Sequence, residues 1–175
     1  MRSTTMMLAM SALLLASCAS TRTREPQALQ LPANDRVNVS WADPATFSEH
    51  SCDFAPGGRD TAWVGDLARY TRDRAEKSLP GGARLDVHFI DIDRAGECLP
   101  NGRAEQIRVI RDMYPPRITL HYRLSGNGVT ATNADARLSD LAFMMNAPGL
   151  PGNSDPLRYE KRVIDDWLRK LLGKR

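Results

Sequence analysis

Three acidic side chains follow one another closely in Asp91-x-Asp93-x-x-Gly96-Glu97, at the end of a predicted strand. The segment begins like an EF-hand calcium loop, because positions one, three and six carry the expected residue types. Position five is Ala95, however, and position twelve is Gly102, where a calcium loop needs a bidentate Glu. We therefore expect a charged strand end and turn, with calcium binding as the less favoured interpretation.

The same carboxylates, Asp91, Asp93 and Glu97, form what we call the acidic corner. They could carry out general acid–base chemistry or hold a metal ion, with His88 or His121 nearby. No nucleophile elbow, His-Glu-x-x-His motif or phosphate-binding glycine loop accompanies them. A metal-dependent or hydrolytic enzyme using the acidic corner is therefore the alternative function, and we predict no catalytic residues and no cofactor.

Cys52 and Cys98 are the two cysteines outside the N-terminal region. In an oxidising compartment such a pair most often forms a disulfide. This bond would close a loop of about 47 residues and stabilise the fold by about 4 kcal/mol in the chain-entropy model. Zinc could instead bind these cysteines with His50 and His88, although His-x-Cys is not a common zinc spacing. Free thiols are the third interpretation, and we expect the disulfide.

Basic and aromatic residues flank a Pro-Pro turn: Arg108, Arg111, Tyr114 and Arg117. Brought together by strand alternation, they could clamp a carboxylate or phosphate of an anionic envelope component. The competing interpretation, which we favour, is internal pairing with Asp112, Asp140 or the last helix. These four residues are nevertheless the candidate ligand-binding site.

The N-terminus has the features of a secretion signal. Arg2 provides the positive charge, and Met6 to Leu15 is apolar but too short to span a bilayer. The run Leu15-Ala16-Ser17-Cys18 resembles a bacterial lipobox, so we expect residues 1–17 to be removed and Cys18 to be lipidated. The alternative is an ordinary signal peptide with a chance cysteine. Ala19, by similarity to the bacterial sorting rule, favours the outer membrane.

The mature chain suits one domain. Removing 17 of 175 residues leaves 158, and loss of Arg2 lowers the net charge from +3 to +2. Acidic and basic residues are interspersed, so no basic face for nucleic acid is predicted. Residues 18–35 are polar and lack periodicity, which predicts a flexible tether. The globular domain is then expected over residues 36–175.

Hydrophobic periodicity predicts an α+β fold with one mostly antiparallel sheet of about four to five strands packed against two helices. Alternation indicates strands over 37–41, 85–93, 118–124 and 129–138, with a short one at 107–109. Asn127-Gly128 predicts a hairpin turn. Helical spacing covers about 61–79 and 157–171, and residues 94–102 are expected to be a loop that holds Cys98.

Several motifs of the second half are similar to a known bacterial envelope family. They are Asp91-Ile92-Asp93-Arg94-Ala95-Gly96-Glu97, Ile107-Arg108-Val109-Ile110-Arg111-Asp112, Pro116-Arg117-Ile118, Arg137-Leu138-Ser139-Asp140-Leu141, Asp155-Pro156-Leu157-Arg158-Tyr159-Glu160-Lys161 and Asp165-Asp166-Trp167. The chain thus resembles the family catalogued as domain of unknown function 3016, over most of residues 36–172. The resemblance implies a small secreted or lipid-anchored protein without an established activity. The cysteine pair is a departure from the family pattern.

Together these features lead us to expect a non-catalytic, lipid-anchored protein of the periplasm. Its partners would be the membrane, through the lipid anchor, and an envelope protein or an anionic envelope component. No nucleic acid is expected.

Overall fold

The structure, a computed structural model, describes residues 29–49, 52, 61–100, 106–145 and 154–173. Its main sheet has five strands in the order β1-β2-β3-β6-β7. Their bounds are Leu29–Gln30, Val37–Trp41, Ala83–Asp93, Arg117–Gly126 and Thr132–Ser139. Neighbouring strands are antiparallel except β2 and β3, which are parallel.

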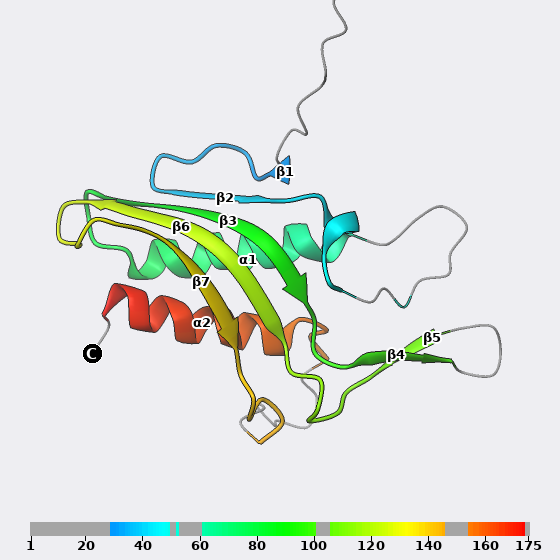
Figure 1. Cartoon of the computed structure of the whole chain (residues 1–175). Coiled ribbons are helices and arrows are strands. Elements are labelled where there is room, and N and C mark those ends of the chain that lie inside the picture. Colours follow the sequence, from blue (N-terminus) through cyan, green and yellow to red (C-terminus); the bar gives the residue numbers. More distant parts are fainter. Residues whose placement is uncertain (1–28, 50–51, 53–60, 101–105, 146–153, 174–175) are drawn as a thin grey trace, which may run out of the picture.

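Two helices, α1 (Ala62–Ser78) and α2 (Arg158–Leu172), cover one face of this sheet, and the other face is open (Figure 1). A second, two-stranded sheet of β4 (Glu97–Pro100) and β5 (Gln106–Val109) extends from one end. A short 3₁₀ helix, η1 (Pro44–Thr46), follows β2. The predicted α+β fold, with a mostly antiparallel sheet and two helices, is confirmed. No helix among the described residues is both long enough and apolar enough to cross a membrane.

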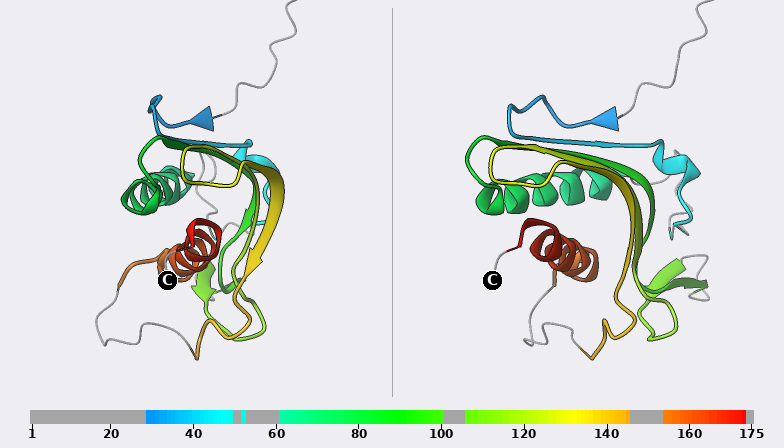
Figure 2. Two further views of the ribbon diagram at one scale, coloured as in Figure 1. Left: turned by 90° about the vertical axis from the view of Figure 1, so that its left-hand side faces the viewer. Right: turned by 60° about the vertical axis from the view of Figure 1, so that its left-hand side comes forward.

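The core lies between the sheet and the helices because apolar residues alternate along the strands. In β3, Leu85, Val87 and Phe89 are almost fully buried. The register then shifts between Phe89 and Asp91, which leaves Ile90 as an extra residue and returns Ile92 to the core. The sheet curves around the helices (Figure 2). This alternation leaves polar side chains on the open face.

The fold begins earlier than predicted, so the tether prediction was wrong for residues 29–35. Leu29 and Gln30 pair with β2, and Leu31 is buried while its N–H donates to the carbonyl of Val39. The Asn34 side-chain oxygen accepts hydrogen bonds from two backbone N–H groups at the start of β2. Side-chain hydrogen bonds hold this segment, and hydrophobic periodicity does not report such bonds. Cys18 lies outside the described residues.

The predicted loop 94–102 was also wrong in part, because residues 97–100 form β4 and pair with β5. The turn that leads into it requires Gly96, which has φ +89° and whose added Cβ would lie 2.6 Å from the Val109 carbonyl oxygen. The strand after the hairpin begins at Thr132, later than predicted, since the turn around Gly126 is longer than a two-residue connection.

Candidate functional site

A polar groove of about 390 Å³ lies on the open face of the sheet. Its floor is made by side chains of β2, β3 and β6 that point away from the core, and the segment after β1 forms one wall. The lining residues are Gln30, Leu31, Ala33, Asn38, Val39, Ser40, Arg84, Asp86, Val87, His88, His121 and Arg123. The strand register arranges the polar members in two rows that run across the sheet.

The first row contains two histidines. Ser40, His88, His121 and Asp135 are in register on β2, β3, β6 and β7. Ser40 Oγ lies 2.9 Å from His88 Nδ1, and His121 Nδ1 lies 2.6 Å from Asp135 Oδ1. The side-chain oxygen of Asn133 is 2.9 Å from His121 Nε2. Each histidine is therefore oriented by a side chain of a neighbouring strand.

These two histidines have opposite pKa shifts. Burial lowers the pKa of His88, and the nearby His121 lowers it further. The hydrogen bond to Asp135 raises the pKa of His121, with a second contribution from Asn133. His121 is therefore the histidine that carries positive charge more readily near neutral pH.

The second row carries fixed charges. Asn38, Asp86, Arg123 and Asn133 are in register across the same four strands. Asp86 accepts hydrogen bonds from Asn38 Nδ2 at 2.9 Å and from Arg84 Nε at 3.2 Å. Arg123 is exposed and forms no ion pair in the described part of the chain. Among the lining residues two arginines thus accompany one carboxylate, Asp86, while the second carboxylate of these rows, Asp135, contacts His121.

The groove suits binding better than covalent catalysis. The Ser40–His88 contact resembles a nucleophile–base pair, but no carboxylate among the described residues bonds to His88 to complete a triad. Ser40 Oγ also lies 3.4 Å from the Val87 carbonyl oxygen, to which it can donate. The described residues contain no group of three or more His, Cys, Asp or Glu side chains that could hold a metal ion.

The three carboxylates of the acidic corner each contact a different partner. Asp91 accepts hydrogen bonds from the backbone N–H and the hydroxyl of Ser48, at 2.6 and 2.7 Å. Asp93 lies 3.4 Å from Arg117. Glu97 accepts a hydrogen bond from Tyr114, which raises the pKa of that phenol. No histidine among the described residues joins these contacts, so in this part of the chain the corner holds segments together and forms no shared site.

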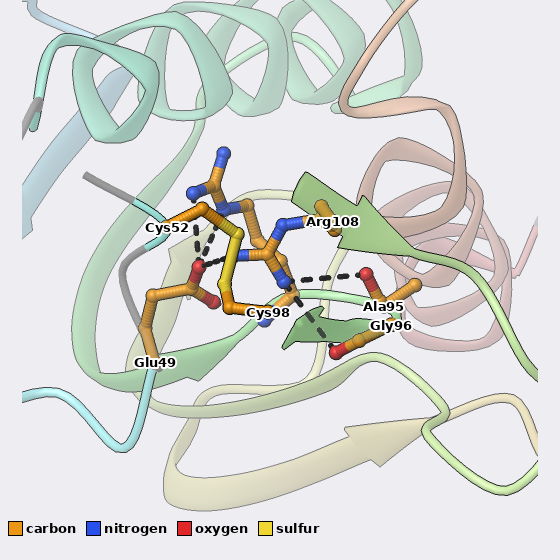
Figure 3. The surroundings of a disulfide bond; sticks show 7 residues. Glu49, Cys52, Ala95, Gly96, Cys98 and Arg108 are labelled. Carbon is orange, nitrogen blue, oxygen red and sulfur yellow. Dashed lines mark hydrogen bonds and ion pairs between the residues drawn. A yellow bond between two sulfur atoms is a disulfide. The ribbon is translucent and has the colours of Figure 1, made fainter. Parts of the chain in front are cut away.

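Cys52 and Cys98 form a disulfide, with their Cα atoms 5.2 Å apart, as the sequence predicts (Figure 3). His50 lies outside the described residues, and His88 contacts Ser40 on the open face of the sheet. The two cysteines are bonded to each other and so are not zinc ligands. The bond joins the segment after η1 to β4.

A largely buried ion-pair network lies beside this disulfide. Glu49, whose side chain is 6% exposed, contacts the guanidinium groups of Arg94, at 2.9 Å, and of Arg108 (Figure 3). Arg108 also lies 3.4 and 3.5 Å from the carbonyl oxygens of Ala95 and Gly96. Burial lowers the pKa of Arg108, and Glu49 opposes that shift. This network therefore connects the same two regions that the disulfide joins.

The predicted arginine clamp does not form as one site. Arg108 is bound to Glu49, and Arg117 contacts Asp93. Arg111 is exposed in the turn before Tyr114, where its carbonyl accepts the Tyr114 N–H. Internal pairing, the favoured interpretation, thus describes Arg108 and Arg117, but their partners are not those predicted from the sequence. A sequence separation of 59 residues conceals the pairing between Arg108 and Glu49.

Sequence reasoning missed the groove, although a signal for it exists. Asp86, His88, His121 and Arg123 alternate with the core residues of their strands, so they must share the face opposite the helices. It also missed Glu160, which is 1% exposed and accepts the Ala95 N–H at 2.8 Å. Burial raises the pKa of Glu160. Nothing in the local sequence indicates that this helix residue is buried.

Comparison with known proteins gives a family and no activity. No curated protein and no solved structure matches the chain. The sequence model of one family, described as protein of unknown function (DUF3016), matches residues 35–170. That match covers α1, all but the last two residues of α2, and four of the five strands of the main sheet, β2, β3, β6 and β7. The chain therefore belongs to the DUF3016 family.

Proposed function

We propose that the mature chain is a lipid-anchored, non-catalytic binding protein of the periplasm, attached through Cys18 to the outer membrane. The order of positive charge, apolar run, small residues and cysteine supports the anchor. Several acyl chains, at about 0.8 kcal/mol per buried CH₂, would hold the protein on the membrane. The described part of the chain starts at Leu29, so the ten residues 19–28 lie between Cys18 and the first described residue.

The ligand is an envelope component that presents a phosphate or carboxylate group to the groove on the open face. The observation that carries this proposal is the exposed Arg123, which has no carboxylate partner in the described residues and stands in register with Asp86. Asp86 is already engaged by Asn38 and Arg84. An anion at Arg123 could receive charge-assisted hydrogen bonds from its guanidinium, while the ring nitrogens of the neighbouring His121 stay bound to Asp135 and Asn133.

An enzyme that uses the acidic corner gains no support from the geometry. Its three carboxylates contact Ser48, Arg117 and Tyr114, and each contact has an evident structural role. General acid–base chemistry requires at least one such group to be directed at a substrate position. The observed contacts of these carboxylates therefore fit a binding protein better than an enzyme that uses the acidic corner.

The anchor is tested by Cys18→Ser in cells that express the full chain. We expect the variant to leave the membrane fraction and to remain folded, because the described fold starts eleven residues later. Far-ultraviolet circular dichroism of the released protein checks the fold. A variant that still fractionates with the outer membrane would contradict lipid anchoring.

Binding at the groove is tested by photo-crosslinking in intact cells. A benzoylphenylalanine replaces Gln30, which is exposed on the groove wall and leaves the charged floor intact. The matched control carries the same group in place of Arg69, an exposed residue of α1 on the helical side. We expect a discrete adduct with an anionic component only from position 30, and its loss when Arg123→Gln is added. Equal adducts from both positions would argue against the groove.

A further inference from the structure

The outer edge of β7 is long, regular and unpaired in the described part of the chain. Thr132–Ser139 pairs with β6 over eight residues without a register shift, and its other side contacts no strand. Alternate residues of β7 therefore direct their N–H and C=O groups away from the sheet. The strand contains no Pro and no bulge, two features that commonly block further pairing at an edge, and its two charged residues, Asp135 and Arg137, are of opposite sign.

The opposite edge of the sheet is different. There the described part of the chain begins with β1, which has two residues, Leu29 and Gln30. Among the described residues the edge formed by β7, with eight residues, is therefore the longer one. The long edge is the one able to accept a further strand.

We propose that β7 pairs with the β7 strand of a second copy of this chain, antiparallel about a two-fold axis at Ala136. The side chains of Asn133, Asp135, Arg137 and Ser139 are exposed on the open face. With the axis at Ala136, Asp135 of each copy stands opposite Arg137 of the other. Symmetry creates this oppositely charged pair twice.

Charge selects this register over its neighbours. Because side chains alternate between faces, an axis placed one residue away, at residue 135 or 137, also keeps the open faces aligned. An axis at Asp135 would bring two aspartates together, and an axis at Arg137 would bring two arginines together. Opposed like charges destabilise a strand pair. Arg137 forms no ion pair among the described residues, so it is available to the second copy.

The dimer has a geometric consequence for the whole molecule. A two-fold axis perpendicular to the sheet places both open faces on the same side and all four helices on the other. The two grooves would then lie on one continuous ten-stranded sheet, twice the five strands of one copy. The proposal of a dimer is argued from the β7 edge and does not depend on what the groove binds.

The test introduces Ala136→Cys into the full chain and treats intact cells with a short, membrane-permeant bifunctional maleimide. Cys52 and Cys98 are bonded to each other, and Cys18 is acylated if our proposal for the anchor holds, so the new thiol is the reactive one. Two copies of residue 136 would be direct cross-strand neighbours, with Cβ atoms about 5 Å apart. We expect a covalent homodimer.

The matched control is Thr132→Cys, also on β7 and, like Ala136, partly buried on the helix side of the sheet. Two copies of residue 132 would lie eight residues apart along the paired strands, about 26 Å, which is beyond the reagent. We expect no dimer from this control. Equal crosslinking of the two variants would overturn the proposed register, and no crosslinking of Ala136→Cys would overturn the pairing.

Charge reversal provides an independent readout. In the Ala136→Cys background, Arg137→Asp places two aspartates opposite each other and should reduce the crosslinked fraction to the level of the control. Adding Asp135→Arg restores opposite charges and should restore the dimer. For the unmodified chain purified in detergent, sedimentation velocity should give the mass of two copies, and Arg137→Asp should raise the dissociation constant about tenfold or more. A monomer at every protein concentration would refute the proposal, even if a cysteine variant misfolds.

Discussion

Removal of the Cys52–Cys98 disulfide should cost a large part of the stability of this domain. The two cysteines are separated by 46 residues in the chain, so the bond constrains a long loop of the unfolded state. In the chain-entropy model a loop of this length corresponds to about 4 kcal/mol at 25 °C. For a chain of this size, a loss of about 4 kcal/mol lowers the melting temperature by roughly 8–16 °C.

The structure adds a second reason to expect a large effect. The bond brings the segment of Glu49 to β4, and Glu49 contacts Arg94 and Arg108 in the same region. Without the bond, closing that segment costs chain entropy before the ion pairs can form. The loss should therefore reach the full value of the entropic model.

The assay is equilibrium urea unfolding of the wild type and of the Cys52→Ser/Cys98→Ser variant, followed by tryptophan fluorescence. Besides the lower free energy of unfolding, we expect a larger dependence on urea for the variant, because its unfolded chain exposes more surface. Reducing agent should lower the wild type to the stability of the variant and should leave the variant unchanged. A loss below about 1 kcal/mol would refute the reasoning, because the bond would then not restrict the unfolded chain as the chain-entropy model requires.

Three further predictions concern other parts of the fold. Arg108→Met should destabilise the domain by about 3 kcal/mol, because it leaves the buried Glu49 with one cation fewer. Urea unfolding should show a change of about 0.5 kcal/mol or less for the control variant, Arg111→Met, whose side chain is on the surface. Phe143→Ala should cost about 3–4 kcal/mol, since Phe143 is buried and packs edge-on against Tyr159 with ring centroids 4.9 Å apart, and a loss under about 1 kcal/mol would show that this cluster is not packed in solution. Asp135→Asn should lower the pKa of His121 in an NMR titration, while the pKa of His88 changes little. Because the folded-state pKa of His121 is raised, its contribution to stability is present at acidic pH and is lost as the pH rises through that pKa, so the variant should lose this pH dependence. An unchanged His121 titration would contradict the contact with Asp135.

The sequence predicts the sheet and helices well because periodicity is a local property. The alternation of Leu85, Val87 and Phe89 identifies both a strand and its buried face. The segment 29–35 is different, since Asn34 and Leu31 are held by partners that are not apparent from their neighbours in sequence. Polar composition alone therefore predicted a tether where part of the fold lies.

The candidate site was harder to predict because it depends on register. Arg108, Arg111 and Arg117 are close in sequence, but Glu49 binds the first and Asp93 the third. Conversely, His88 and His121 are far apart in sequence and become neighbours only when β3 and β6 pair. Proximity in the chain was thus a poor guide to proximity on the sheet.

The most direct test of the proposed binding site is an NMR titration of the folded chain with inorganic phosphate at constant ionic strength. We predict chemical-shift changes that concentrate at His88, His121 and Arg123, that disappear in Arg123→Gln and that persist in Arg111→Gln, an exposed arginine outside the groove. Sodium chloride at the same ionic strength should not reproduce them. Shifts spread over the whole surface, or equal responses of the two variants, would contradict an anion site in the groove.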